Sequence, residues 1–278
     1  MTAPPGGIVR EFMHSYLEAV PQGTTIRAAA ERMQLRRIGS VLVESVDPKR
    51  GFSGIVTETD LVRKVLAAGL DPTVTRVDQV MASPVLTIAA ERSMLDASQL
   101  METNQIRHLC VVEGEDTAGL ISVRDLVRSF VDAESGPVCE LDKVYRPLSV
   151  LMATTLGTIR SEEPILAAAR LMKERRIGSL LVVEAGEIVG IVTESDLVRK
   201  GLAGNVDAAS TRIGGLMTHP LISIDINRTI RDASEVMAEK RVRHLAVREL
   251  HKIVGVLSIR DLVKMVSVRD RPRFLGQA

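Results

Sequence analysis

Apolar residues form the same pattern four times along the chain. Each copy contains a stripe at positions i, i+3, i+4 and i+7, with small residues at its centre, which predicts a helix with one buried face. The stripes are Ile26, Ala29, Ala30 and Met33; Met94, Ala97, Ser98 and Met101; Ile165, Ala168, Ala169 and Met172; and Ile230, Ala233, Ser234 and Met237. We therefore expect four related helices that pack closely against other elements.

Two β-branched runs follow each predicted helix, as in "IGSVLVE" and "FSGIVT" of the first copy. Runs of this composition, joined by a short polar loop, predict a pair of strands. A short extended stretch such as "PVLTI" (84–88) precedes the helix, and a second helix follows where the chain reads T-x-x-D or S-x-x-D. Each copy is therefore expected to be a β-α-β-β-α unit.

The copies are repeats of one sequence. "GIVTETDLVRK" at 54–64 returns as "GIVTESDLVRK" at 190–200, with weaker echoes at 119–129 and 255–265. The first and third copies share "RRIGS", whereas the second and fourth share "RHL", which indicates that an ancestral pair was duplicated. We expect repeats 1 to 4 at 10–70, 78–131, 149–204 and 213–268.

The expected repeats form two modules, 1–130 and 149–268, joined by a linker at 131–148. The linker segment contains charges, Gly and Pro without a helical period, which is typical of a connection. A methionine also recurs near the start of each repeat, at Met13, Met81, Met152 and Met217. Such a residue is more often core filling than part of a site.

Composition narrows the class of protein. The formal net charge is +1, which gives no strong field to recruit nucleic acid or an anionic membrane. No apolar run approaches the ~18 residues of a membrane-spanning helix, and the start of the chain does not resemble a secretory signal. Two cysteines, Cys110 and Cys139, are too few for a disulfide framework. A reduced cytoplasmic protein is the expectation.

The T/S-x-x-D steps have an ordinary interpretation. A hydroxyl at the end of a strand, followed by an acid three residues later, is the arrangement of a helix cap, and such a cap contributes roughly 1 kcal/mol. The fourth residue is Asp in all four repeats, however, and a short carboxylate beside a hydroxyl also suits the two hydroxyls of a ribose. Both interpretations stay open from the residues alone.

Four aligned repeats with these steps resemble the tandem CBS-domain family, named after cystathionine β-synthase. The resemblance covers roughly residues 10 to 268 and, in architecture, extends to the γ subunit of AMP-activated protein kinase. It implies an α/β fold of four β-α-β-β-α CBS repeats that form two pseudo-two-fold Bateman modules. It also implies clefts between paired repeats that hold adenosine-containing ligands.

The resemblance assigns candidate residues to each part of such a ligand. The ribose contacts would be Thr57, Asp60, Ser122, Asp125, Thr193, Asp196, Ser258 and Asp261. The start of the second strand of the partner repeat would form the wall of the adenine pocket, and the residues there are Ile38, Gly39, Ile106, Ile177, Gly178 and Val242, which are otherwise ordinary core and turn residues. Arg107, His108, Arg243, His244, Arg124 and Arg260 are candidate phosphate contacts or, alternatively, solvated basic residues.

The basic pairs depart from the family's pattern. The pairs here read Arg-His, whereas the kinase γ subunit carries His-Arg at the equivalent positions, so which side chain enters the cleft is open. Repeats 1 and 3 also place a hydroxyl, Thr59 or Ser195, where repeats 2 and 4 place Arg124 or Arg260. The clefts are therefore expected to be of two chemical types, with fewer than four ligands bound per chain.

The expected function is regulatory and non-catalytic. The chain would bind AMP, ADP, ATP or S-adenosylmethionine, with or without Mg²⁺ and with no obligatory cofactor, and pass its state to an unidentified effector protein. The repeats would assemble as a homodimer or as a disc within one chain. No P-loop, HExxH, G-x-S-x-G or metal-spaced Cys/His cluster indicates an enzyme. The alternatives are an assembly module with empty clefts and a regulator that responds to a divalent cation.

Overall fold

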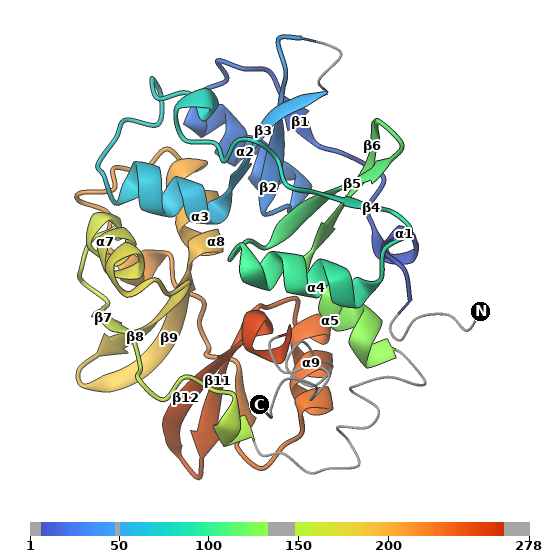
Figure 1. Cartoon of the computed structure of the whole chain (residues 1–278). Helices are drawn as coiled ribbons and strands as arrows, with labels where there is room; N and C mark the ends of the chain where they lie inside the picture. The colour runs from blue at the N-terminus through green and yellow to red at the C-terminus, as the bar shows by residue number, and fades with distance from the viewer. Residues whose placement is uncertain (1–6, 48–50, 133–147, 264–278) are drawn as a thin grey trace, which may run out of the picture. The chain divides into compact units, whose positions relative to one another are not determined.

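The computed structural model describes residues 7–47, 51–132 and 148–263 (Figure 1). The predicted linker at 131–148, with Cys139, lies almost wholly outside the described residues. Helices and strands alternate along the chain as the four-repeat pattern predicts, and the α/β fold class is confirmed. None of the helices in the described ranges is long and apolar enough to cross a membrane.

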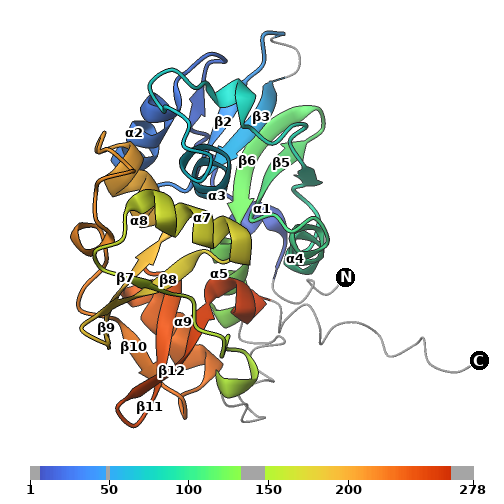
Figure 2. The ribbon, with the colours of Figure 1, turned by 90° about the vertical axis from the view of Figure 1, so that its left-hand side faces the viewer.

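Each repeat contains one three-stranded mixed sheet. The first strand is parallel to the second, and the second is antiparallel to the third, as β10, β11 and β12 show in Figure 2. The sheets are β1 (Ala19–Val20), β2 (Ser40–Glu44) and β3 (Phe52–Thr57); β4 (Thr87–Ala89), β5 (His108–Glu113) and β6 (Asp116–Ser122); β7 (Thr158–Arg160), β8 (Ser179–Glu184) and β9 (Glu187–Thr193); and β10 (Ser223–Asp225), β11 (His244–Glu249) and β12 (Lys252–Ser258).

The four striped helices begin where the apolar period begins. They are α2 (Ile26–Arg36), α4 (Met94–Thr103), α7 (Ile165–Arg175) and α9 (Ile230–Glu239), and all sixteen stripe residues are buried. Thr25, Ser93 and Thr229 cap three of these helices with their hydroxyls, and Pro164 occupies the cap position of the fourth. The stripe and the cap together position each helix on its sheet.

The second helix of each repeat starts at the T/S-x-x-D step. In repeats 1 and 3 a single α-turn, α3 (Glu58–Asp60) or α8 (Glu194–Asp196), continues as a wider π-helix, η2 (Leu61–Leu66) or η5 (Leu197–Leu202). Repeat 2 has the regular helix α5 (Val123–Asp132), and residues 259–263 are helical in repeat 4. Shorter helices are α1 (Val9–Phe12), η3 (Val77–Gln79), η4 (Leu148–Val150) and η6 (Ile213–Gly215).

The chain divides into two compact units that cut across the order of the repeats. The odd unit, Leu17–Val85 with Leu156–Ile222, holds the sheets of repeats 1 and 3. The even unit, Met1–Tyr16 with Leu86–Thr155 and Ser223–Ala278, holds those of repeats 2 and 4.

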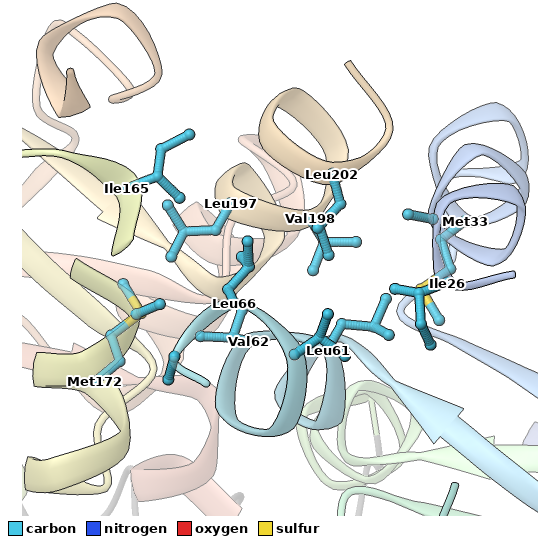
Figure 3. Packing of buried hydrophobic residues seen from close by; sticks show 14 of the residues in the cluster. Ile26, Met33, Leu61, Val62, Leu66, Ile165, Met172, Leu197, Val198 and Leu202 are labelled. Atoms are coloured by element: carbon cyan, nitrogen blue, oxygen red, sulfur yellow. The ribbon is translucent and has the colours of Figure 1, made fainter. Parts of the chain in front are cut away.

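The core of the odd unit is shared by its two repeats. Helix α2 of repeat 1 packs against η5 of repeat 3, and α7 of repeat 3 packs against η2 of repeat 1. Leu61 and Leu66 of η2 and Leu197 and Val198 of η5 fill the space between the helices (Figure 3). Because of this reciprocal packing, repeats 1 and 3 share one hydrophobic core.

One apolar cluster of the even unit lies in repeat 2. Met94 of α4, Leu109 of β5 and Leu126 of α5 are fully buried there, and Val9 of the short helix α1 joins them. Helix α5 also packs against α9 of repeat 4.

The leading segments are exchanged between paired repeats. Met13 at the start of repeat 1 packs on Gly119 of repeat 2, and Met81 at the start of repeat 2 packs on Gly54 of repeat 1. Repeats 3 and 4 exchange segments in the same way, with Met152 on Gly255 and Met217 on Gly190. Backbone bridges accompany all four contacts: His14 with Leu120, Ala82 with Ile55, Ala153 with Val256 and Thr218 with Ile191. The recurring methionines therefore fill the space above four strand glycines.

Candidate functional site

The four hydroxyl–Asp steps share one geometry. Each hydroxyl donates to Oδ2 of the Asp three residues later, at 2.6, 2.7, 2.6 and 2.5 Å in repeats 1 to 4. The same Oδ2 accepts the backbone N–H of the hydroxyl residue at 3.0, 2.8, 3.0 and 2.9 Å. The pairs are Thr57 with Asp60, Ser122 with Asp125, Thr193 with Asp196, and Ser258 with Asp261.

This geometry is that of a capping box, and the chain uses it elsewhere as a cap. Ser93 and Asp96 form the same box at the start of α4, as do Thr229 and Asp232 at the start of α9. This chain therefore also uses Asp at the fourth position of capping boxes that are not candidate ribose sites. The ribose role of the four steps stays a prediction, and it depends on what surrounds each carboxylate.

The start of the second strand lies beside the step in every repeat. Register pairs Ser40 with Thr57, His108 with Ser122, Ser179 with Thr193, and His244 with Ser258. Directly opposite residues of an antiparallel pair share one face of the sheet. The carbonyls of Gly39, Arg107, Gly178 and Arg243 accept the N–H of the residue after the hydroxyl, at 3.0, 3.1, 3.0 and 2.9 Å. Of the adenine candidates, Gly39 and Gly178 are thus bonded to the step of their own repeat. The remaining candidates each precede a bonded residue by one position: Ile38, Ile106, Ile177 and Val242.

The register decides which basic residue lies nearer the step. His108 and His244 are directly opposite the hydroxyl residues, and Nδ1 of both rings is buried. Arg107 and Arg243 precede them and are partly exposed. Arg124 is exposed, and Arg260 is partly buried. In the Arg-His pairs, the histidine therefore shares the face of the hydroxyl.

The carboxylates of repeats 1 and 3 are bound to lysines. Oδ1 of Asp60 lies 2.8 Å from Nζ of Lys64, and Oδ1 of Asp196 lies 2.8 Å from Nζ of Lys200. Each lysine also donates to a backbone carbonyl at 2.6 Å, that of Val80 or Leu216. Both oxygens of each Asp are thus committed to contacts within the odd unit.

The similar sequences at 54–64 and 190–200 also join repeats 1 and 3 directly. Glu58 accepts a hydrogen bond from Ser195 Oγ at 2.9 Å, and its Oε1 lies 3.4 Å from Arg199. The same contacts recur in reverse, with Glu194 bonded to Thr59 Oγ1 at 2.8 Å and 3.5 Å from Arg63. We call these two sets of contacts the clasp.

The clasp accounts for a feature that the sequence left ambiguous. Thr59 and Ser195 bind the glutamate of the other repeat, and Glu58 and Glu194 are 0% and 2% exposed. The glutamates were not among the candidate residues, because an acid in the first turn of a helix is ordinarily a surface residue that favours the helix dipole. Repeats 2 and 4 have Val123 and Ile259 at these positions and cannot form a clasp of this kind.

The carboxylate of repeat 2 has a different partner. Oδ1 of Asp125 lies 3.0 Å from Nε2 of His14, which the exchanged N-terminal segment places there. The hydrogen bond to Asp125 raises the pKa of His14 above its ordinary value, against partial burial. Burial favours a higher pKa for Asp125, but hydrogen bonds from His14 and Ser122 outweigh it and hold that pKa below its ordinary value. The carboxylate is therefore ionised at neutral pH.

Two observations bear on metal binding and on nucleophilic chemistry. Among the residues of the described ranges, no group of three or more His, Cys, Asp or Glu side chains is placed to hold a metal ion. Cys110 is a buried free thiol, and burial raises its pKa to about 11, which makes it a poor nucleophile at neutral pH.

Comparisons with known proteins identify all four repeats. The family model of the CBS domain matches residues 9–67, 77–132, 148–203 and 213–268. The structure of MJ1225 from Methanocaldococcus jannaschii, which was proposed as an archaeal homologue of γ-AMPK, superposes with a TM-score of 0.76. That match covers 92% of this chain and 99% of that chain at 20% identity, which shows a shared fold alone.

Relatives found by sequence match different shares of this chain. The CBS domain-containing protein CBSCBSPB2 of Arabidopsis thaliana is 26% identical over 266 residues, which are 86% of this chain and 49% of the relative. The CBS domain-containing protein YhcV of Bacillus subtilis is 32% identical over 111 residues, 40% of this chain and 79% of that protein. This chain thus spans about half the length of its long plant relative.

Proposed function

The chain belongs to the CBS-domain family, and from this premise we propose that it is a non-catalytic sensor of an adenosine-containing ligand. The ligand is AMP, ADP, ATP or S-adenosylmethionine, with Mg²⁺ as an optional companion of the nucleotides. The hydroxyl–Asp steps of repeats 2 and 4 hold its ribose. The bound state is passed to an effector protein, from a homodimer or from a disc formed within one chain.

One observation carries the proposal. In repeats 2 and 4 a histidine lies directly opposite the hydroxyl of the step, His108 opposite Ser122 and His244 opposite Ser258. A carboxylate that suits ribose hydroxyls and a ring N–H that suits phosphate therefore occupy adjacent places on one face. Arg107, Arg243, Arg124 and Arg260 are neighbours in sequence of the histidines and of the Asp residues, and we propose that they add positive charge for the phosphates.

The steps of repeats 1 and 3 are assigned a structural role. Asp60 and Asp196 are held by lysines that are themselves bonded to the backbone, and the clasp fills the neighbouring positions. Opening such a site breaks two bonds of each lysine. Ser40 and Ser179 also occupy the places of the histidines, directly opposite Thr57 and Thr193. We therefore propose at most two ligands per chain.

Thermal unfolding with AMP, ADP, ATP, S-adenosylmethionine and GTP, each with and without Mg²⁺, tests this function. At ten times its Kd, one bound ligand adds about 1.4 kcal/mol to the free energy of unfolding. We expect an adenosine ligand to raise the midpoint, GTP to leave it unchanged, and Asp125→Ala with Asp261→Ala to abolish the shift.

Asp96→Ala with Asp232→Ala is the matched control. These residues form the same capping box at α4 and α9 without a strand histidine opposite it. The control variant should lose stability from its caps and keep the full ligand shift. If no member of the panel moves the midpoint, the steps are caps only.

A second candidate function rests on the self-contained bonding of the steps. All four hydroxyl–Asp pairs satisfy one another without a ligand, which suits a module that only assembles. A response to Mg²⁺ alone in the same panel would instead favour a cation-responsive regulator.

A further inference from the structure

Repeats 2 and 4 are equivalent at the step but not in the segment that covers it. The exchanged segment of repeat 1 pairs His14 with Leu120, two residues before Ser122. The exchanged segment of repeat 3 pairs Ala153 with Val256, two residues before Ser258. His14 and Ala153 therefore occupy the same place in the two halves, and only the first carries an ionisable side chain.

His14 occupies the oxygen that a ribose would need. Oδ2 of Asp125 already accepts the Ser122 hydroxyl and the Ser122 N–H, at 2.7 and 2.8 Å. An ionised carboxylate accepts about four hydrogen bonds, so Oδ1 is the oxygen left for the two hydroxyls of a ribose. His14 Nε2 lies 3.0 Å from that oxygen, and the Asp125 side chain is only 8% exposed beneath it.

The His14 side chain is also able to move away from the Asp125 carboxylate. Its side chain is 66% exposed, and the bond to Asp125 is the contact that holds the ring over the carboxylate. The lysines of repeats 1 and 3 differ, because each is bonded to a backbone carbonyl as well as to its Asp. The position of Lys64 and Lys200 is Ser129 in repeat 2 and Met265 in repeat 4.

We propose that His14 competes with the adenosine ligand for Asp125, so that the site of repeat 2 binds more weakly than it would with an apolar residue at this place and loses affinity as the pH falls. This inference rests on the proposed function and adds to it a competitor from within the chain. A ligand that enters repeat 2 displaces His14 from the carboxylate, and Ala153 occupies the equivalent place in repeat 4.

The sign of the pH dependence follows from the charges around His14. Asp125 and Arg128 of α5 face the ring, with Asp125 favouring its protonated form and Arg128 opposing it, and the bridged residue of β6 is the apolar Leu120. The net effect raises the pKa of His14 above 6.5. Below that pKa the ring is cationic and holds Asp125 more tightly, so the ligand is disfavoured; above it the neutral ring is displaced more easily.

Isothermal titration calorimetry on five variants tests this competition. Asp261→Ala leaves the site of repeat 2, and Asp125→Ala leaves the site of repeat 4. His14→Ala is added to the first and Ala153→His to the second, with His14→Gln as a variant of the first that keeps a hydrogen-bond donor without a titratable ring. Each protein is titrated with AMP, ADP, ATP and S-adenosylmethionine at about pH 8.5 and about pH 5.5, on either side of the ordinary histidine pKa.

We expect His14→Ala to lower the Kd of repeat 2 by about threefold to fivefold at low pH, the effect of an ion pair whose histidine is largely exposed to solvent. Ala153→His should raise the Kd of repeat 4 by a similar factor. The phosphates of a nucleotide titrate in the same way whichever variant binds it. The difference in Kd between the proteins with and without His14 therefore isolates the effect of the His14 ring. His14→Gln should remove the difference between repeats in pH dependence.

The outcomes separate this inference from the proposed function. Binding to repeat 2 that is unchanged or weakened by His14→Ala overturns the competition and leaves the sensor function standing. Binding by none of the proteins, wild type included, overturns both.

Discussion

Replacing Glu58 by Gln is expected to lower the free energy of unfolding by about 3 kcal/mol, the lower end of the range for breaking a buried ion pair. Glu58 is 0% exposed and its partner Arg199 is 26% exposed, so part of the charge is screened by solvent. The substitution keeps the shape of the side chain but leaves Arg199 without its counter-charge. For a protein of this size the midpoint of thermal unfolding should fall by about 6–12 °C.

The chain contains its own controls for this prediction. Glu194→Gln breaks the symmetric half of the clasp with Arg63 and should cost about the same. Glu31→Gln removes an exposed pair with Arg27 and should cost no more than about 0.5 kcal/mol. A double-mutant cycle of Glu58→Gln with Arg199→Met measures the coupling directly. Equal, small losses for Glu58→Gln and Glu31→Gln would show that the clasp does not hold repeats 1 and 3 together.

Gly54→Val is the second substitution with a large expected effect. A Cβ at Gly54 would lie 2.5 Å from Met81 Sδ and 2.9 Å from the carbonyl oxygen of Ala82. The sulfur can move, but the carbonyl belongs to the bridge between the exchanged segment and β3. We expect a loss of about 3 kcal/mol, at the upper end of the usual range for overpacking.

Gly215→Ala is the matched control for the glycine prediction. No atom lies within 4 Å of a Cβ built there, so the substitution should be close to neutral. Urea unfolding of both variants measures the difference. A Gly54→Val protein as stable as the control would mean that the segment of Met81 does not pack on β3, and that paired repeats do not exchange their leading segments.

The local architecture could be predicted because each repeat carries its own pattern. The helix starts at Ile26, Met94, Ile165 and Ile230 follow from the period of the apolar stripe and the preceding cap residues. Strand pairs such as β8 and β9 follow from β-branched runs around a short loop. These signals act over ten or fewer residues and survive in a single sequence.

Other local features had no sequence signal. Arg37, Gln105, Arg176 and Arg241 adopt left-handed backbone angles just before the second strand, with φ between 53° and 56°. Glycine or asparagine usually marks such a position. The repeats instead place long side chains there, so the turn was not expected at these residues.

The arrangement of the repeats depends on contacts that a sequence pattern does not encode. The prediction that 1–130 and 149–268 are two Bateman modules stays a prediction, and the exchange of leading segments supports that pairing. One compact unit instead joins repeats 1 and 3 through their helices. The apolar stripes of these helices show that one face is buried, but they do not show which element covers that face. The sequence gives no signal for the clasp for this reason, since Glu58 contacts Ser195 and Arg199 only when repeats 1 and 3 pack together.

The candidate site was predicted in part. The hydroxyl and the Asp of each step do meet, as a cap requires, and the register brings His108 and His244 beside them. The role of His14 was not foreseen, because it reaches Asp125 from a segment 111 residues away. The ribose, adenine and phosphate assignments stay predictions.

The number of adenosine ligands bound per chain is the most direct test of the ribose sites proposed in repeats 2 and 4. Isothermal titration calorimetry of the full chain, with the ligand that the unfolding panel identifies, measures that number. We expect no more than two sites, which are lost in the Asp125→Ala, Asp261→Ala protein and kept in the Asp60→Ala, Asp196→Ala protein if it remains folded. Three or four sites, or binding that survives removal of Asp125 and Asp261, would contradict the assignment of the ribose sites to repeats 2 and 4.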